Sequence, residues 1–225
     1  GIVFGSDFER FSFRVNMDND INKWLTTGLR ASVARTKQTN SVDGSGAIYN
    51  ALNQLPEVPA RNPDGSFGMQ TENMYGTYFS NPLSDLIQNE NYSRSTQVYV
   101  NAFADIKLWK GLVFRTEYAA NYNYNTGYRF TPSYDYEFFK QQSSASRSAG
   151  NGSNWTLKTY LTYNGTFGKH NVSVMAGHEA QENNWESLDG SRTNFLFNSV
   201  HELNAGDATT AKANSSRGSS AIESY

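Results

Sequence analysis

The chain has 225 residues, no cysteine and a net charge of −2 at pH 7. The missing cysteines exclude disulfides, thiolate catalysis and cysteine metal ligands, and a pI near 5.9 gives no reason to expect a nucleic acid as partner. Mean hydropathy is −0.65, and no apolar run approaches the ~18 residues of a transmembrane helix. A β-barrel is compatible with this polar average, because only alternate residues of its strands meet lipid.

The first predicted hairpin pairs strands over about 8–18 and 24–36 through a polar turn at 18–23. In the first strand, apolar and polar residues alternate without an exception over eight positions. Because successive side chains of a β-strand point to opposite faces, each strand has one apolar and one polar face. The apolar residues are Phe11, Phe13, Val15 and Met17 before the turn, and Leu25, Leu29, Ala31 and Val33 after it.

Two further hairpins follow the same rule. Their strands are predicted at about 95–107 with 112–125, and at about 154–167 with 170–183. Tight turns at 107–111 and 168–171 join them. Their apolar faces carry Val98, Val100, Ala102, Ala104 and Ile106; Leu112, Phe114, Tyr118, Ala120 and Tyr122; Trp155, Leu157, Leu161, Tyr163 and Phe167; and Val172, Val174 and Ala176.

Long polar segments at about 38–93, 127–153 and 185–225 separate or follow the hairpins. Short turns at one end of the strands and long loops at the other are typical of a transmembrane β-barrel, with periplasmic turns and extracellular loops. Several strands reach the ~10 residues that a tilted strand needs to cross a bilayer. We therefore predict an all-β fold, an antiparallel transmembrane β-barrel segment of about six strands in three hairpins, with residues 1–225 in one β-barrel domain.

The polar faces carry charged residues that suit a wet lumen: Arg14, Arg30, Arg115, Glu117 and Lys158. Six strands are too few for a closed bacterial barrel, and an open sheet would leave unpaired edges in lipid. We therefore expect the chain to be a piece of a larger barrel. The alternative is a soluble β-sandwich, such as a carbohydrate-binding module at the cell surface, because a sandwich also pairs apolar and polar faces.

The loops supply the candidate contacts for a ligand or a partner protein. The sequence Asn62-Pro63-Asp64-Gly65 predicts a turn, because Pro fixes φ and Gly supplies the permissive position. Aromatic side chains can stack on sugar rings or hold peptide side chains, but they can also pack a loop onto the barrel rim. The candidates are Tyr75, Tyr78, Phe79, Phe130, Tyr134, Tyr136 and Phe138.

The residues do not suggest catalysis, a metal site or a cofactor. Asp18-Asn19-Asp20 opens like a calcium loop, but Lys23 occupies the position where that motif needs Gly. His170, His178 and His201 are the only histidines, and none pairs with another at metal-ligand spacing. We therefore expect a protein that is not an enzyme.

The order and spacing of several segments resemble the SusC-like (SusC/RagA) TonB-dependent outer-membrane transporters of Bacteroidetes. The resemblance covers about residues 1–185, and no single motif in it is specific by itself. Its segments are 5–18 (GSDFERFSFRVNMD), 21–25 (INKWL), 56–59 (PEVP), 62–66 (NPDGS), 81–83 (NPL), 109–115 (WKGLVFR), 167–172 (FGKHNV) and 177–179 (GHE).

This resemblance implies a 22-stranded barrel in the bacterial outer membrane, filled by an N-terminal plug and capped by a SusD-like surface lipoprotein. Such proteins import oligosaccharides (glycans) or peptides, driven by TonB and the inner-membrane proton gradient. In the family, the plug and the TonB box precede the barrel, so the resemblance implies that both are absent from this chain. Its expected partners are the SusD-like lipoprotein, TonB through that absent region, outer-membrane lipid and the substrate.

Overall fold

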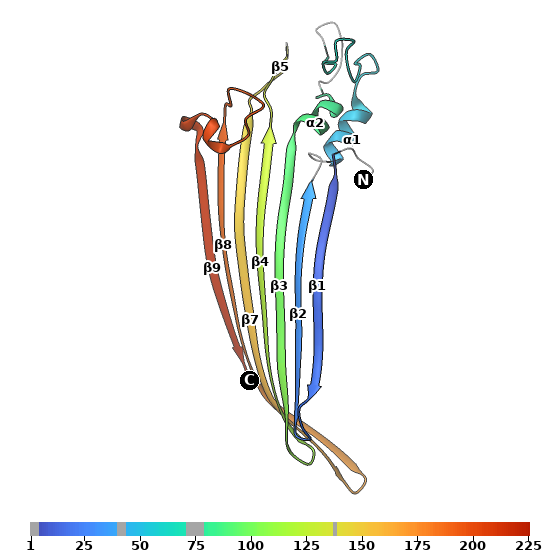
Figure 1. The fold of residues 1–225 in the computed structure, drawn as a ribbon, viewed down its shortest axis with the longest axis vertical. Coiled ribbons are helices and arrows are strands. Elements are labelled where there is room, and N and C mark those ends of the chain that lie inside the picture. The colour runs from blue at the N-terminus through green and yellow to red at the C-terminus, as the bar shows by residue number, and fades with distance from the viewer. Residues whose placement is uncertain (1–4, 40–43, 71–78, 137–138) are drawn as a thin grey trace.

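The computed structural model describes residues 5–39, 44–70, 79–136 and 139–225. Most of them belong to long antiparallel strands, and the remaining elements are short and lie at one end of these strands (Figure 1). The strands are β1 (Asp7–Asp20), β2 (Leu25–Thr39), β3 (Glu90–Trp109), β4 (Leu112–Thr131), β5 (Tyr134–Tyr136), β6 (Phe139–Gln141), β7 (Ser144–Phe167), β8 (His170–Thr193) and β9 (Lys212–Ser224). The helices are α1 (Gly44–Asn53), α2 (Pro82–Gln88), η1 (Leu203–Ala205) and η2 (Ala208–Thr210).

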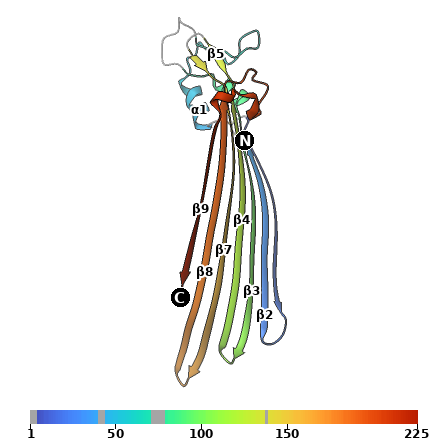
Figure 2. The ribbon, with the colours of Figure 1, turned by 90° about the vertical axis from the view of Figure 1, so that its left-hand side faces the viewer.

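Seven strands form one sheet in the order β1-β2-β3-β4-β7-β8-β9, and every neighbouring pair is antiparallel. Each strand therefore pairs with its neighbours in sequence within this sheet, and β5 with β6 forms a separate two-stranded ribbon. Figures 1 and 2 show a tall, open, curved sheet with the short turns at one end and the helices at the other. Neither α1 nor α2, the α-helices of the described residues, is long and apolar enough to span a membrane.

The short turns follow from local chemistry. Asn22 closes the first one, since its Oδ1 accepts hydrogen bonds from the backbone N–H of Trp24 and of Leu25, both at 2.9 Å. At the second turn Gly111 has φ of +81°, and a Cβ there would lie 2.1 Å from the carbonyl oxygen of Asn164. Only glycine fits this position without displacing β7.

Asn81 holds the first external segment together. It is buried, and its Nδ2 donates to the carbonyl oxygens of Ala60 at 3.1 Å and Gly68 at 2.8 Å. Its Oδ1 accepts from the N–H groups of Leu83 and Ser84, which caps α2. One side chain therefore joins three stretches of the chain.

The predicted turn at 62–65 is confirmed. The N–H of Gly65 donates to the carbonyl of Asn62 at 2.9 Å, and the N–H of Asn62 donates to the carbonyl of Ser66 at 2.8 Å. Asp64 accepts from the N–H and the hydroxyl of Ser66, and these hydrogen bonds lower the pKa of the Asp64 carboxyl below its ordinary value.

A small apolar cluster closes the other side of the same end. Phe130 is completely buried and packs edge-to-face on Phe195, with ring centroids 5.5 Å apart. The His201 ring stacks on Phe130 at 4.0 Å. Buried Ser143 joins β7 to this cluster, since its Oγ accepts from the N–H of Phe195 at 2.8 Å. The cluster consists of Tyr128, Phe130, Ala145 and Phe195, with Tyr92, Leu203 and Ala205 packed against it.

The strands extend far beyond their predicted ends, so three predicted loop ranges need correction. Much of 127–153 belongs to β4 and β7, and much of 185–225 belongs to β8 and to β9, a seventh strand of the sheet that the sequence did not reveal. The range 38–93 contains α1, α2 and the start of β3. The added strand segments are rich in Ser, Asn, Gly and charged residues, so they lack the apolar face that marks a strand in the sequence.

We predict that Asn81→Ala loosens the first external segment while leaving the sheet intact. The substitution leaves two carbonyls and the first turn of α2 without partners, which costs about 1–3 kcal/mol. Hydrogen exchange of the full-length protein should accelerate over residues 58–70 and 82–88. The matched control is Asn53→Ala, because Asn53 is exposed and donates only to the Tyr49 carbonyl of its own helix. Equal exchange in both variants would contradict the central role of Asn81.

Candidate functional site

One face of the sheet carries an exposed apolar band. The register places the apolar residues of β1, β2, β3, β4, β7 and β8 on this outer face. Its large side chains are exposed, with 76% of Phe11 and 62% of Phe13 accessible. The described part of the chain contains no second sheet over this face. The band consists of Phe11, Phe13, Val15 and Met17; Leu25, Leu29, Ala31 and Val33; Val98, Val100, Ala102, Ala104, Ile106 and Leu108; Phe114, Tyr118, Ala120 and Tyr122; Trp155, Leu157, Leu161, Tyr163 and Phe167; and Val172, Val174, Ala176 and Ala180.

The band crosses the strands obliquely. On β1 its end nearest the helices is Phe11, whereas on β8 the corresponding end is Ala180, which stands in register with Met17. The band's edge therefore shifts by about six residues over five strand steps. At ~3.3 Å per residue and ~4.8 Å per strand, the strands are tilted by roughly 40° to the normal of the band. The row that links the two ends is Met17, Leu29, Ala102, Tyr118, Leu157 and Ala180.

This tilt is what a bilayer requires of barrel strands, which cross it at about 35–45°. Trp155 lies at the band's edge on β7, on the side of the helices, and it stacks on Tyr118 of β4 with ring centroids 6.4 Å apart. The indole N–H of Trp155 donates to Glu182 at 3.1 Å, across the boundary between the band and the polar part of β8. Trp24 and Trp109 lie near the other edge, beside the short turns, and both are exposed.

Comparison with known proteins agrees with this geometry. No protein-family model matches the chain. It is 27% identical to TonB-dependent receptor P3 and 28% identical to TonB-dependent receptor P39, both of Formosa agariphila, over 96% and 93% of its length. The chain is a homologue of TonB-dependent receptors. It spans only about a fifth of these relatives, 22% and 21% of their lengths.

Solved structures show the same fold. The chain matches structures of the RagAB peptide importer in its closed-closed state and of the RagAB peptide transporter, with TM-scores of 0.72 and 0.75 at 19% identity. These matches cover 95% and 96% of the chain and 25% of each matched chain. The fold prediction is confirmed: this TonB-dependent receptor homologue is a segment of an antiparallel β-barrel, and its sheet is not closed.

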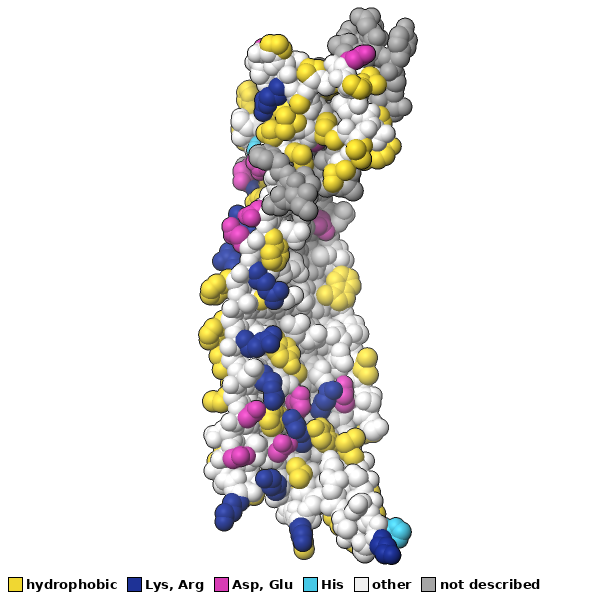
Figure 3. Space-filling model, turned by 90° about the vertical axis from the view of Figure 1, so that its right-hand side faces the viewer, with side chains coloured by type: hydrophobic (Ala, Val, Ile, Leu, Met, Phe, Trp, Pro, Cys, Tyr) yellow, Lys and Arg dark blue, Asp and Glu magenta, His cyan; other side chains and the backbone are white. Residues whose placement is uncertain are grey.

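The opposite, inner face carries the five charged residues that the sequence predicted to face a lumen. Figure 3 shows side chains of both charges gathered along the strands. In the register, Glu117 stands between Phe103 and Lys158, and Lys158 stands next to Glu179. Lys158 forms an ion pair with Glu179 at 3.2 Å. The five predicted residues on this face are Arg14, Arg30, Arg115, Glu117 and Lys158.

Arg115 is the centre of this polar network. Its Nη1 lies 3.5 Å from Asp105 and its Nε lies 3.7 Å from Glu117, while its guanidinium stands 4.2 Å from the centroid of the Phe103 ring. Asn101 donates to the same Glu117 at 2.7 Å. Two carboxylates therefore share one half-buried guanidinium.

The sequence did not predict the contact between Phe103 and Gly28, because sequence alone does not give the register between β2 and β3. A Cβ at Gly28 would lie 2.0 Å from Cε1 of Phe103, so the ring occupies the space that glycine leaves on β2. Arg30 stands 5.2 Å from the same ring and pairs with Asp18 at 3.4 Å. An aromatic residue on a polar face, with a glycine on the adjacent strand, is the signal that could have found this contact.

Four of the seven aromatic loop candidates lie within the described residues. Phe130 and Tyr134 are buried, so in this structure they pack the rim and offer almost no surface to a ligand. Phe79 is half-buried just before α2. Tyr136 ends β5. Tyr75, Tyr78 and Phe138 lie outside the described residues.

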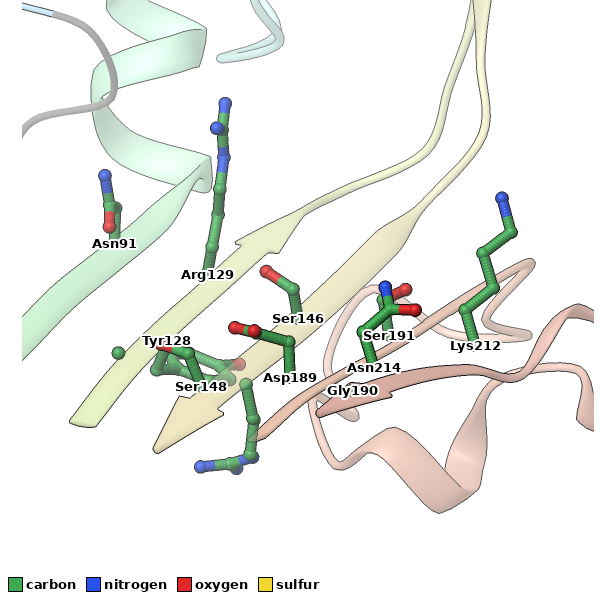
Figure 4. A pocket seen from close by; sticks show the side chains of 12 residues that line it. Asn91, Tyr128, Arg129, Ser146, Ser148, Asp189, Gly190, Ser191, Lys212 and Asn214 are labelled. Atoms are coloured by element: carbon green, nitrogen blue, oxygen red, sulfur yellow. The ribbon is translucent and has the colours of Figure 1, made fainter. Parts of the chain in front are cut away.

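Instead, the structure shows a polar hollow on the inner face near the helix-bearing end. It has a volume of about 330 Å³. Figure 4 shows Arg129, Asp189 and Lys212 rising from the same side of the sheet, with Tyr128 turned to the other side. Gly127 and several serines have small side chains, so the floor of the hollow lies close to the backbone of the sheet. The lining also includes Asn91, Ser146, Ser148, Ser191 and Asn214. Two cations, a carboxylate and several hydroxyls can hydrogen-bond a polar oligomer.

No group of three or more His, Cys, Asp or Glu residues within the described residues could hold a metal ion. The lining of the hollow offers charged and hydrogen-bonding groups.

We predict that Val100→Arg and Ser215→Arg differ sharply although both side chains lie on the outer face. Val100 lies in the middle of the band on β3, where an arginine costs about 2–4 kcal/mol in contact with lipid. Ser215 lies on β9 beyond the band, so its replacement should cost about 0–1 kcal/mol. Urea unfolding of the full-length protein in phospholipid vesicles measures both. Equal costs would contradict the position of the band.

A second prediction concerns the inner face. Arg115→Met removes the guanidinium that Asp105 and Glu117 share and should destabilise the folded protein by about 1–3 kcal/mol. Arg30→Met removes one exposed ion pair and should cost about 0–1 kcal/mol. Both variants lose one positive charge, so the same unfolding measurement compares them directly. A larger loss from Arg30→Met would refute the central place of Arg115.

Proposed function

We propose that this chain is part of the wall of a TonB-dependent importer in the bacterial outer membrane. The single observation that carries the proposal is the oblique apolar band on one face, combined with homology to TonB-dependent receptors. Under this proposal the outer face meets lipid, the inner face meets the water-filled interior, the short turns face the periplasm and the helices face the exterior. Arg14, Arg30, Arg115, Glu117 and Lys158 then line the lumen.

The whole assembly performs the transport. Residues 1–225 are part of one β-barrel domain, and the barrel, as in SusC-like proteins, has 22 strands. The plug and the segment that contacts TonB lie outside this chain. The chain itself supplies wall, inner surface and external rim, and it performs no catalysis.

The proposed partner is a SusD-like lipoprotein that covers the external end. The support is the fold shared with the structures of the RagAB peptide importer. The proposed substrate is a peptide or an oligosaccharide. The hollow around Arg129, Asp189 and Lys212 suits both, because it offers donors and acceptors without a large apolar wall.

A soluble β-sandwich module accounts for the structure less well. A sandwich buries its apolar face against a second sheet, whereas here the band stays exposed over six strands. The roughly 40° slope of the band has no function in a sandwich, but it follows directly from strands that cross a bilayer.

The test is uptake by cells that carry the full-length protein. Oligomers that co-purify with it are identified by mass spectrometry, labelled and offered to wild-type and TonB-deficient cells. Uptake that requires both the protein and TonB supports the proposal. Uptake that persists without TonB, or a full-length protein that is monodisperse without detergent, would overturn it.

The hollow is tested in the same assay with the double variant Arg129→Gln and Lys212→Gln. We expect it to raise the substrate concentration for half-maximal uptake at least about threefold, because two hydrogen-bonding cations are lost. The matched control is Arg217→Gln combined with Lys169→Gln, which removes two positive charges outside the hollow. Equal uptake by both variants would show that the hollow does not bind the substrate.

A further inference from the structure

Three cations stand together on the outer face, just beyond the apolar band. Arg35 and Lys37 lie on β2, two and four residues past Val33 of the band, and Arg94 lies on β3, four residues past Val98. All three positions share the outer face with the band. We call these residues the basic cluster.

The basic cluster has more cations than facing carboxylates. Lys37 and Arg94 are direct cross-strand partners, an arrangement of like charges that destabilises a sheet. Glu9 stands opposite Lys37 on its other side, but within the described residues no carboxylate lies within 4 Å of the cationic groups of the cluster. An external anion bound between β2 and β3 would interact favourably with both Lys37 and Arg94.

Two outer-face arginines elsewhere in the sheet can be compared with the cluster. Arg147 of β7 forms two hydrogen bonds of 2.9 Å with Glu202. Arg217 of β9 stands opposite Glu186 of β8, just as Lys37 stands opposite Glu9, and within the described residues neither pair forms an ion pair. The basic cluster therefore sets three cations against one facing carboxylate, although the chain as a whole is slightly acidic.

The height of the cluster identifies the anion. With ~3.3 Å per residue and a tilt of roughly 40°, two to four residues past the band correspond to about 5–10 Å above the hydrocarbon edge. Lipid headgroups occupy this layer, since the polar regions add about 5–8 Å on each side of the ~30 Å core. Lys and Arg at this level attract anionic lipids.

The surface beside the cluster has room for a bulky headgroup. Arg94 lines an outer-face hollow of about 510 Å³ with Tyr92, Ala149 and Leu188. Arg94 also stands 5.2 Å from the ring of Tyr92, which keeps its guanidinium close to the sheet. A ligand bound here would place its phosphate on the cations and its sugar or backbone atoms over small residues.

We propose that Arg35, Lys37 and Arg94 bind the phosphate of a membrane lipid whose headgroup carries a net negative charge, in the outer leaflet. The proposal rests on the membrane position given above and is independent of transport. The occupant is a lipid, and a freely dissolved phosphate ion is excluded, because the cluster is continuous with the lipid-facing band.

The test is a titration of the detergent-solubilised full-length protein with diphosphoryl lipid A, followed by native mass spectrometry. Each cation near a membrane surface contributes about fivefold to affinity, so Arg35→Gln, Lys37→Gln and Arg94→Gln together should weaken binding by roughly 100-fold. Inorganic phosphate should neither bind measurably nor compete. Neutral phosphatidylcholine should bind the variant and the wild type equally.

The matched control removes the same number of positive charges at the other end of the strands, through Lys23→Gln, Lys110→Gln and Lys169→Gln. It should bind lipid A as the wild type does. The charge-preserving pair Arg35→Lys and Arg94→Lys should retain binding within about threefold. The proposal would be overturned if the triple glutamine variant bound lipid A as tightly as the wild type. It would also be overturned if the control lost as much affinity as that variant, or if inorganic phosphate competed effectively.

A neutral variant that fails to fold still leaves the wild type as a test. Raising NaCl from 50 to 300 mM screens exposed charges, so wild-type affinity for diphosphoryl lipid A should fall at least about tenfold, while phosphatidylcholine binding stays constant. A salt-independent affinity would overturn the proposal on the wild type alone.

Discussion

The constraint on which this structure depends is that backbone N–H and C=O groups must be paired wherever the chain meets lipid. Inside the seven-stranded sheet this constraint is satisfied, because long antiparallel hydrogen-bond ladders join each strand to the next. Two of the short turns are closed by a side-chain cap at Asn22 and by glycine at Gly111, and the β3–β4 register shifts once, between Lys107 and Trp109. The two edge strands, β1 and β9, are where the sheet must be continued by other strands to complete a barrel.

A tilted ladder through a slab of lipid divides each strand into a membrane part and an external part. The division falls at a different residue on each strand, since the band shifts along the sheet. On β1 it falls near Phe11, and on β8 near Ala180. The described part of β9 lies almost wholly beyond the band, so its outer face consists of Ala213, Ser215, Arg217, Ser219 and Ala221. The height of the band therefore determines which residues meet lipid, headgroups or water.

The same division explains how much the sequence could predict. Alternation at residues such as Phe11 and Val100 is strong inside the band, because lipid on one side and water on the other select opposite chemistry. Beyond the band both faces meet water, so the upper parts of β7 and β8 and all of β9 carry no alternating signal. The network of Arg115 with Asp105, and the contact of Phe103 with Gly28, require the register between strands. The sequence of a single chain indicates where a strand lies. It does not show which residue of the neighbouring strand pairs with each residue of that strand.

The most direct test of the account is the environment of adjacent residues on one strand. The chain has no cysteine, so Val100→Cys and Asn101→Cys introduce single spin-label positions in this region. Electron paramagnetic resonance of the full-length protein in vesicles then compares accessibility to oxygen, which dissolves in lipid, with accessibility to a water-soluble nickel chelate. The account predicts that the label at 100 favours oxygen and that the label at 101 favours the chelate. Equal accessibility at both positions, or the reverse order, would contradict it.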